Sequence, residues 1–241
     1  SNQNNKVQNK LKIIGDQILT KNLLEIKKFI LIILKKPFFW KKKHFISFLL
    51  LPLSLITFTV NFLKIFQKKK KYKIKTICVG NIYIGGTGKT PLVNNLANHL
   101  KKKNKTFIIK KNYFSHEDEK KMLESKHKVI FEKTREESLL KAEQEKAKIV
   151  IFDDGLQEKT INYDLKIVCF NSLKLDGNGH VIPAGPLRER LNSLKNYDVA
   201  LINGNTNKET KNFIEKIKNI NPDLKIFMGK YIPKNFSNLK K

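Results

Sequence analysis

The sequence has 241 residues, enough for one α/β domain with additions and a core that is stable without disulfides. Its net charge is +28, which invites a nucleic-acid partner. The basic residues are almost all lysine, however, and they are spread along the chain beside abundant asparagine, which indicates genomic composition, so we expect no nucleic-acid binding. Cys78 and Cys169 lie in apolar runs, which predicts buried, reduced thiols and excludes a disulfide scaffold.

Residues 1–36 form an extension of uncertain origin. The opening SNQNNKVQNK is polar and is predicted to be disordered. Residues 19–34 have apolar side chains at helical spacing, which favours a helix that seeks the membrane. Because the chain begins with Ser1 and not with methionine, we expect it to be a fragment at one end or both.

Residues 37–71 are predicted to hold a membrane-associated hydrophobic helix with basic flanks. Residues 45–60 carry no charge, but a full span needs about 20 apolar residues, and Pro52 would kink a helix. The lysines at 41–43 and 68–71 favour anionic lipid by roughly 1 kcal/mol each. An interfacial helix or a short anchor fits these features; the alternative is a buried core helix of a soluble protein.

Residues 79–93, VGNIYIGGTGKTPLV, are an apolar strand that runs into a glycine turn and then a helix. Such a turn presents backbone N–H groups to nucleotide phosphates. The predicted nucleotide-binding residues are Tyr83, Ile84, Gly85, Gly86, Thr87, Gly88, Lys89 and Thr90. Lys89 is expected to reach the outer phosphates and Thr90 to ligate Mg²⁺. A strict Walker pattern would have glycine where Tyr83 stands, and a turn without a ligand is the alternative.

Residues 147–157, AKIVIFDDGLQ, are a second apolar run that ends in two carboxylates. Runs of this kind are buried parallel strands, and their C-terminal ends form the ligand edge of an open α/β sheet. Asp153 and Asp154 are therefore expected beside the phosphate loop, with one of them near Mg²⁺. An ordinary Asp-Asp-Gly turn is the alternative.

With the block at residues 182–189, IPAGPLRE, these motifs make the chain resemble the tetraacyldisaccharide 4'-kinases of lipid A synthesis, from about residue 37 to about residue 233. The resemblance implies transfer of the γ-phosphate of ATP to the 4'-hydroxyl of a tetraacyldisaccharide 1-phosphate, forming lipid IVA. It also implies a location at the cytoplasmic face of the bacterial inner membrane and an anionic membrane surface as a partner. No protein partner is implied.

The resemblance extends to single residues. An Asp-Glu pair of the family matches Asp118 and Glu119, so Asp118 is expected to help deprotonate the acceptor hydroxyl, while Glu119 and Gln157 are expected near substrate or phosphate. A solvated helix start is the alternative for residues 116–119. Arg188 matches the family motif and is one of only three arginines, which predicts a planar fork on a phosphate; Arg190 is expected to be a surface charge.

Two departures from the family raise alternatives. The Ser-Arg-Gly-Tyr-Gly stretch reads KKNYF at residues 110–114, so only Tyr113 matches. No Phe-Pro-Asp-His-His type motif follows before residue 241, which predicts a chain truncated at its C-terminus or a catalytically dead remnant that binds lipid and ATP. A partitioning-type P-loop ATPase is a further alternative, although its signature lysine before the two glycines is Ile84 here.

Strand-like and helical segments alternate after residue 72. Strands are expected at 74–79, 106–109, 128–131, 148–152, 165–170, 198–202 and 225–227, and helices at 91–102, 135–146 and 208–219. This alternation predicts an α/β, P-loop NTPase-like fold with a doubly wound, mostly parallel sheet. Residues 72–241 would form the kinase core, incomplete at its C-terminus.

Overall fold

The structure is a computed structural model that describes residues 37–111 and 117–232. Residues 39–241 make one compact unit and residues 1–38 another. The helix predicted within residues 19–34 lies outside the described residues, as does Tyr113. The predicted strands and the three sequence motifs all belong to the unit from residue 39 onward.

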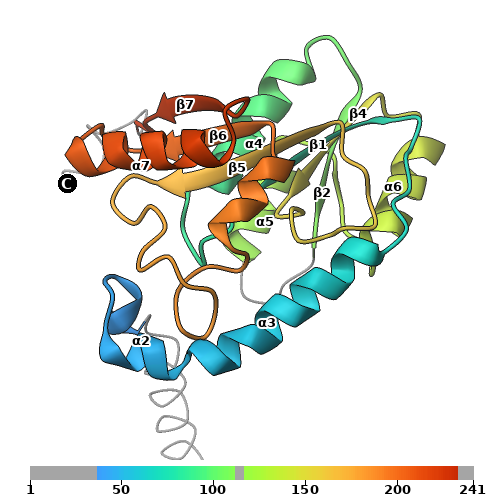
Figure 1. The fold of residues 1–241 in the computed structure, drawn as a ribbon. Helices are drawn as coiled ribbons and strands as arrows, with labels where there is room; N and C mark the ends of the chain where they lie inside the picture. The colour runs from blue at the N-terminus through green and yellow to red at the C-terminus, as the bar shows by residue number, and fades with distance from the viewer. Residues whose placement is uncertain (1–36, 112–116, 233–241) are drawn as a thin grey trace, which may run out of the picture. The chain divides into compact units, whose positions relative to one another are not determined.

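A seven-stranded sheet forms the centre of this unit, in the order β3-β2-β4-β1-β5-β6-β7 (Figure 1). Every neighbouring pair of strands is parallel. The strands are β1 (Lys75–Gly80), β2 (Thr106–Lys110), β3 (Val129–Ile130), β4 (Ile149–Asp153), β5 (Leu165–Asn171), β6 (Val199–Asn203) and β7 (Lys225–Gly229). All seven predicted strands and the parallel α/β fold are confirmed. β1 lies between β4 and β5, so its C-terminal end is central in the ligand edge of the sheet.

Alternate residues of the strands pack into two different clusters, which is why both faces of the sheet are covered. One cluster joins Val93 and Ala97 of α4 (Lys89–Leu100) and Leu123 of α5 (Glu117–Glu124) to residues such as Ile151. The other cluster receives α6 (Arg135–Gln144), α7 (Lys208–Ile220) and the 3₁₀ segment η3 (Leu191–Asn196), for example through Phe213 against Phe170. Buried runs such as IVIF in β4 therefore meet helices on both sides.

The helices begin at residues whose backbone or side chain suits a helix start. Thr134 and Glu137 form a capping box on α6, and the Asn207 side chain accepts from the N–H of Thr210 at the start of α7. α4 begins at Gly88. These three helices confirm the predicted ones to within two residues, whereas α5 was weighed only as a solvated helix start and η3 was not predicted.

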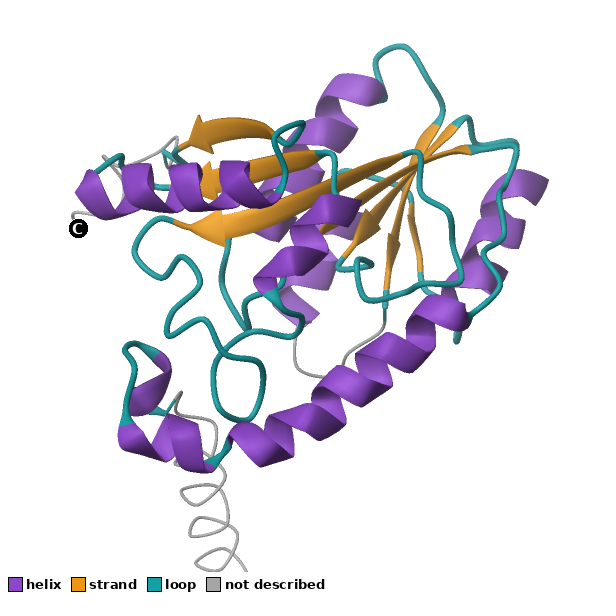
Figure 2. Ribbon diagram, viewed as in Figure 1, coloured by secondary structure: helices purple, strands orange, loops and turns teal. Residues whose placement is uncertain are grey.

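The uncharged segment at residues 45–60 is divided into two helices, α2 (Phe45–Leu49) and α3 (Leu51–Leu63), with short 3₁₀ segments η1 (Phe38–Trp40) and η2 (Lys64–Phe66) on either side (Figure 2). Pro52 lies in the first turn of α3, where its missing N–H costs nothing. Within the described residues, none of the helices has the length and apolar character needed to cross a bilayer.

The buried side of α3 is polar and its exposed side is apolar, the reverse of a core helix. The Ser54 hydroxyl donates to the carbonyl of Val181 at 2.9 Å, and the Asn61 amide donates to the carbonyl of Arg188 at 2.7 Å. Ile56 and Leu63 are 65% and 61% exposed. The helix is therefore fixed to the loop at residues 181–188 by hydrogen bonds and leaves its apolar side chains uncovered, which excludes the alternative of a buried core helix.

The two thiols give a direct test of the fold. Both cysteines are buried, and burial raises the pKa of Cys78 and of Cys169 to about 12, because the thiolate loses its hydration. Both groups should therefore stay protonated at mildly alkaline pH and show no reaction with the thiol reagent DTNB in the native chain. Denaturation in guanidinium should release two reactive thiols. Prompt reaction of either thiol in the native chain would contradict this core.

Candidate nucleotide and phosphoryl-transfer site

The glycine turn joins the C-terminal end of β1 to the first residue of α4, as the sequence predicts. Its backbone has a positive φ at Gly85 (91°) and at Gly88 (85°), a conformation that residues other than glycine rarely adopt. A Cβ at Gly88 would also lie 2.6 Å from the side chains of both Asn203 and Tyr231. A glycine turn that leads into a helix N-terminus provides backbone N–H donors of the kind that bind phosphate.

Asn81 shapes this loop from beneath. Its side chain is fully buried and donates to the carbonyls of Tyr83 at 2.6 Å and Gly85 at 3.2 Å, which satisfies two carbonyls of the loop. Thr87 is also buried, and its hydroxyl has no hydrogen-bond partner among the described residues. An uncompensated hydroxyl inside a phosphate loop is a group that a bound ligand could satisfy.

Asp153 ends β4 and is almost completely buried. The Thr90 hydroxyl lies 3.3 Å from its Oδ2, and the Lys110 ammonium lies 2.8 Å from the same oxygen. The register of the sheet explains the second contact, because Lys110 of β2 lies directly beside Asp153 of β4. The side chain of Lys110 is only 9% exposed, so the pair is screened from water.

Asp154 points to a different set of groups. Its backbone is left-handed (φ 68°), and both of its carboxylate oxygens accept from one terminal nitrogen of Arg188, at 2.9 and 3.1 Å. The Lys89 ammonium is 4.0 Å from the same carboxylate, and Arg135 donates to the Asp154 carbonyl. The left-handed turn after β4 therefore sends two adjacent carboxylates to two separate cationic environments.

The three sequence motifs meet in one hydrogen-bonded network. The loop at residues 182–189 runs antiparallel to the first half of the phosphate loop, with the Ile84 N–H donating to Pro186 at 2.9 Å and the Arg188 N–H donating to Ile82 at 2.6 Å. Gln157 completes the network, since its amide donates to the Asn81 carbonyl at 3.1 Å and its Oε1 accepts from Arg188 at 3.1 Å.

The predicted site residues divide into two groups. Residues 83–90, Asp153, Asp154, Gln157 and Arg188 come together at the C-terminal ends of β1 and β4. Asp118 and Glu119 lie in the first turn of α5, and their side chains are outside the described part of the chain. Arg190 lies away from this site, with its guanidinium 4.0 Å above the ring of Phe58.

Several residues of the site were not predicted to belong to it. Lys110 enters through sheet register and Arg135 through α6. Lys110 was noted only as a departure from the family stretch at residues 110–114, and the sequence carries no local motif for Arg135. Tyr231 follows β7 and donates from its hydroxyl to the Gly88 carbonyl at 2.8 Å; burial raises its pKa to about 12. Asn203 is the last residue of β6, and Tyr231 follows β7. Only these positions at the C-terminal ends of neighbouring strands could have indicated the two residues.

The donor atoms suit a magnesium nucleotide. Residues 37–111 and 117–232 contain no cluster of three or more His, Cys, Asp or Glu side chains able to hold a metal. Mg²⁺ commonly binds through one or two carboxylates together with phosphate oxygens and water, so a hydroxyl beside a carboxylate is sufficient. Thr90 and Asp153 provide that pair, and the loop amides provide for the phosphates.

Comparison with known proteins identifies one family over most of the chain. A family model described as tetraacyldisaccharide-1-P 4'-kinase matches residues 46–240. A tetraacyldisaccharide 4'-kinase of Pelagibacter ubique is 49% identical over 213 residues, covering 86% of this chain and 67% of its own length. One from Rickettsia bellii is 37% identical over 188 residues, covering 70% of this chain and 59% of its own length. The chain thus spans about two thirds of these relatives.

The fold is shared with a solved structure as well. The crystal structure of LpxK from Aquifex aeolicus in complex with ATP superposes with a TM-score of 0.57 at 21% identity. The match covers 81% of this chain and 84% of that one. At this identity the likeness shows the fold, a P-loop NTPase-like arrangement.

The buried pair of Lys110 and Asp153 predicts a large effect on stability. Lys110→Met should lower the free energy of unfolding by about 3–5 kcal/mol, because it leaves a buried carboxylate without its nearest cation. Lys128→Met is the matched control, since Lys128 and Glu145 form an exposed pair, and its cost should stay below about 1 kcal/mol. Urea denaturation measures both. Equal effects would show that the buried pair is not structurally important.

Proposed function

Since this chain belongs to the tetraacyldisaccharide 4'-kinase family, whose members phosphorylate lipid A precursors using ATP, we propose that it carries this phosphoryl transfer itself. The reaction would move the γ-phosphoryl group of ATP to the 4'-hydroxyl of tetraacyldisaccharide 1-phosphate and form lipid IVA. The observation that carries the proposal is the network in which residues 182–189 and Gln157 tie the phosphate loop to the two aspartates. Membership of this family excludes the alternative of a partitioning-type ATPase.

The nucleotide would lie on the loop amides of residues 83–90, with its phosphates toward the N-terminus of α4. Lys89 is 16% exposed and sits beside Asp154, so its ammonium is held near the loop and not extended into solvent. When bound, ATP supplies the phosphoryl group, and Lys89 would stabilise the charge that spreads over its oxygens during transfer.

Mg²⁺ would be held by Thr90 and Asp153, and when bound it would neutralise phosphate charge. Asp153 is favoured over Asp154 because its Oδ2 already accepts a hydrogen bond from the Thr90 hydroxyl. Asp154 would instead orient Arg188, whose guanidinium it binds together with Gln157. Arg188 would then be positioned to bind a phosphate of either substrate.

Asp118 is the proposed base for the acceptor hydroxyl, with Glu119 close to the substrate. Both residues begin α5, which follows β2 in the chain, and β2 ends at Lys110 on the same sheet edge as Asp153. A carboxylate there could accept a proton from a sugar hydroxyl, while positioning and electrostatics supply most of the acceleration.

We further propose that the chain works at the cytoplasmic face of the inner membrane. α2 and α3 expose apolar side chains such as Phe45 (77%) and Leu49 (68%), and lysines precede and follow them at 41–43 and 68–71. Apolar side chains flanked by lysine favour an anionic lipid surface. A soluble nucleotide could then meet an acceptor that remains in the bilayer.

Phosphoryl transfer tests the proposal directly. The purified chain in detergent micelles, given Mg²⁺, γ-labelled ATP and tetraacyldisaccharide 1-phosphate, should label the lipid. Lys89→Ala should lower turnover at least about a hundredfold, as the loss of a transition-state cation does. Lys102→Ala, an exposed lysine after α4, is the control and should keep full turnover. ATP binding without any transfer by the wild-type chain would refute the kinase assignment.

The assignment of Asp118 has its own test. Asp118→Ala should depress turnover by about a hundredfold or more while ATP affinity stays unchanged, because a proton acceptor contributes to the chemical step and not to nucleotide binding. Glu124→Ala removes an exposed carboxylate from the end of the same helix and should have no effect. Full turnover by the Asp118 variant would assign the proton acceptor elsewhere.

A further inference from the structure

Lys110 and Asp153 form a buried ion pair at the edge of the sheet where the phosphate loop begins its helix. Their side chains are 9% and 2% exposed, and the ammonium lies 2.8 Å from the carboxylate. Register holds the pair together, because Lys110 is the last residue of β2 and lies beside Asp153, the last residue of β4. The fold thus fixes one positive charge on the carboxylate that is proposed to hold Mg²⁺.

The two partners of this carboxylate meet at a single oxygen. The Thr90 hydroxyl lies 3.3 Å and the Lys110 ammonium 2.8 Å from Oδ2 of Asp153. The ammonium is therefore next to a hydroxyl in the first turn of α4, at the place proposed for the metal.

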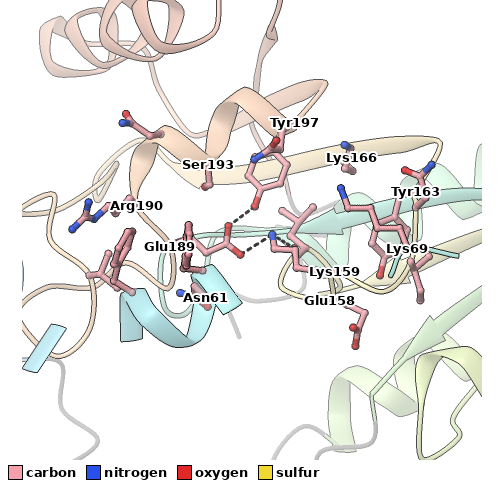
Figure 3. A pocket seen from close by; sticks show the side chains of 18 residues that line it. Asn61, Lys69, Glu158, Lys159, Tyr163, Lys166, Glu189, Arg190, Ser193 and Tyr197 are labelled. Atoms are coloured by element: carbon pink, nitrogen blue, oxygen red, sulfur yellow. Dashed lines mark hydrogen bonds and ion pairs between the residues drawn. The ribbon is translucent and has the colours of Figure 1, made fainter. Parts of the chain in front are cut away.

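A second buried lysine pair in the chain is built differently. Lys159 lies 3.1 Å from Oε1 of Glu189, while the Tyr197 hydroxyl donates to Oε2 at 2.9 Å, as the dashed lines in Figure 3 show. Its lysine and hydroxyl thus bind opposite oxygens, and neither belongs to the phosphate loop. This pair is a comparison for effects that come from burial alone.

The charge on Lys110 matters because nucleotide phosphates are strongly anionic. A carboxylate that is screened from water repels such a ligand unless a cation compensates it. In many nucleotide sites a divalent ion is the largest local positive charge and provides this compensation. Here the Lys110 ammonium compensates Asp153 before any ion arrives, because the chain itself carries it.

The same ammonium opposes the entry of a metal ion. Two cations that are drawn to one carboxylate repel each other, and burial reduces the screening between them. The pair should therefore favour binding of ATP without a metal and weaken the binding of Mg²⁺ at Thr90 and Asp153.

Serine is the informative replacement at this position. The Ser-Arg-Gly-Tyr-Gly stretch expected from the family resemblance has serine where this chain has Lys110. A serine side chain keeps a hydroxyl donor but has no charge. Lys110→Ser therefore removes the compensating charge and leaves a polar group at the end of β2.

We propose that Lys110 is a built-in counter-ion that supplies part of the charge otherwise provided by Mg²⁺, so that this chain binds ATP in the absence of divalent ions. The inference rests on the proposed function, which places Mg²⁺ at Thr90 and Asp153. Lys110 is a positioning residue in this role, since it acts on the ligands through Asp153.

Calorimetry of ATP binding to the full chain, with Mg²⁺ and with EDTA, tests the proposal. Wild type should bind ATP in both conditions, with affinities within about tenfold of each other. Lys110→Ser should bind ATP like wild type with Mg²⁺ but at least about tenfold more weakly in EDTA, because only the ion then compensates Asp153. An equal loss in both conditions indicates a deformed loop and would overturn the proposal, as would failure of wild type to bind ATP in EDTA.

Two control variants separate this effect from general ones. Lys111→Ser removes an exposed lysine next to Lys110, and Lys159→Ser breaks the other buried lysine pair. Both should keep the wild-type ratio between the two ATP affinities. A change in that ratio as large as the one in Lys110→Ser, from either control, would contradict the special role of Lys110.

A double variant keeps the test decisive if Lys110→Ser does not fold. Lys110→Ser/Asp153→Asn removes both charges of the pair, so no unpaired carboxylate remains. It should bind ATP in EDTA as tightly as wild type does, because the repulsion is gone together with the counter-ion. Weak binding by the double variant would show that ATP needs Lys110 itself, which would overturn the counter-ion role.

Metal binding without nucleotide gives an independent readout. Mn²⁺ serves as the probe, and electron paramagnetic resonance measures its affinity for the chain. Lys110→Ser should bind Mn²⁺ at least about tenfold more tightly than wild type, because a cation beside the carboxylate has been removed. The same affinity in both proteins would contradict the proposal.

Phosphoryl transfer measured on the same samples keeps the two hypotheses apart. The expected change in the ratio of ATP affinities, found without any transfer by wild type, would contradict the proposed function and leave the role of Lys110 standing. Transfer by wild type with an unchanged ratio in Lys110→Ser would contradict the role of Lys110 alone.

Discussion

The antiparallel contact between the phosphate loop and residues 182–189 is the constraint on which the site depends. Ile84 and Arg188 each donate a main-chain hydrogen bond across it, and Leu187 is fully buried between them. A glycine-rich turn has few side chains that could restrict its conformation, so neighbouring segments must stabilise that conformation. Here the neighbouring loop supplies that support, and the same loop carries Arg188 to Asp154. Binding surface and charged side chain are thus positioned by one pairing.

Two adjacent aspartates can serve different purposes because the strand ends between them. Asp153 is the last residue of β4 and keeps the direction that the sheet gives it, toward Thr90 and Lys110. Asp154 is already in a left-handed turn and faces Arg188 and Lys89. Like charges so close together would repel, and each is compensated by its own cations. Neighbouring positions in the chain thus place two carboxylates in separate surroundings.

The sequence predicted what depends on local pattern. Apolar runs bounded by turns located all seven strands, because buried parallel strands must be apolar on both faces. The motif residues of the phosphate loop and of residues 153–157 could be predicted because each block directly follows an apolar run whose C-terminal end lies at the ligand edge of the sheet. Lys110 could not be identified as part of the site, since its contact with Asp153 arises from the register between β2 and β4, 43 residues apart in the chain. The apolar face of α3 was visible, but its polar attachment through Ser54 and Asn61 requires the fold.

The hydrogen bond from Tyr231 to the Gly88 carbonyl links the outermost strand of the sheet to its centre. β7 is an edge strand paired only with β6, and edge strands are the parts of a sheet that open most readily. Tyr231 follows β7 directly, so the closed form of that edge and the shape of the phosphate loop share a contact. By thermodynamic reciprocity, a ligand that stabilises the loop in this shape also stabilises the edge strand, by the same free energy that a docked edge strand adds to ligand binding. A nucleotide bound to this loop would in this way also stabilise the edge of the sheet.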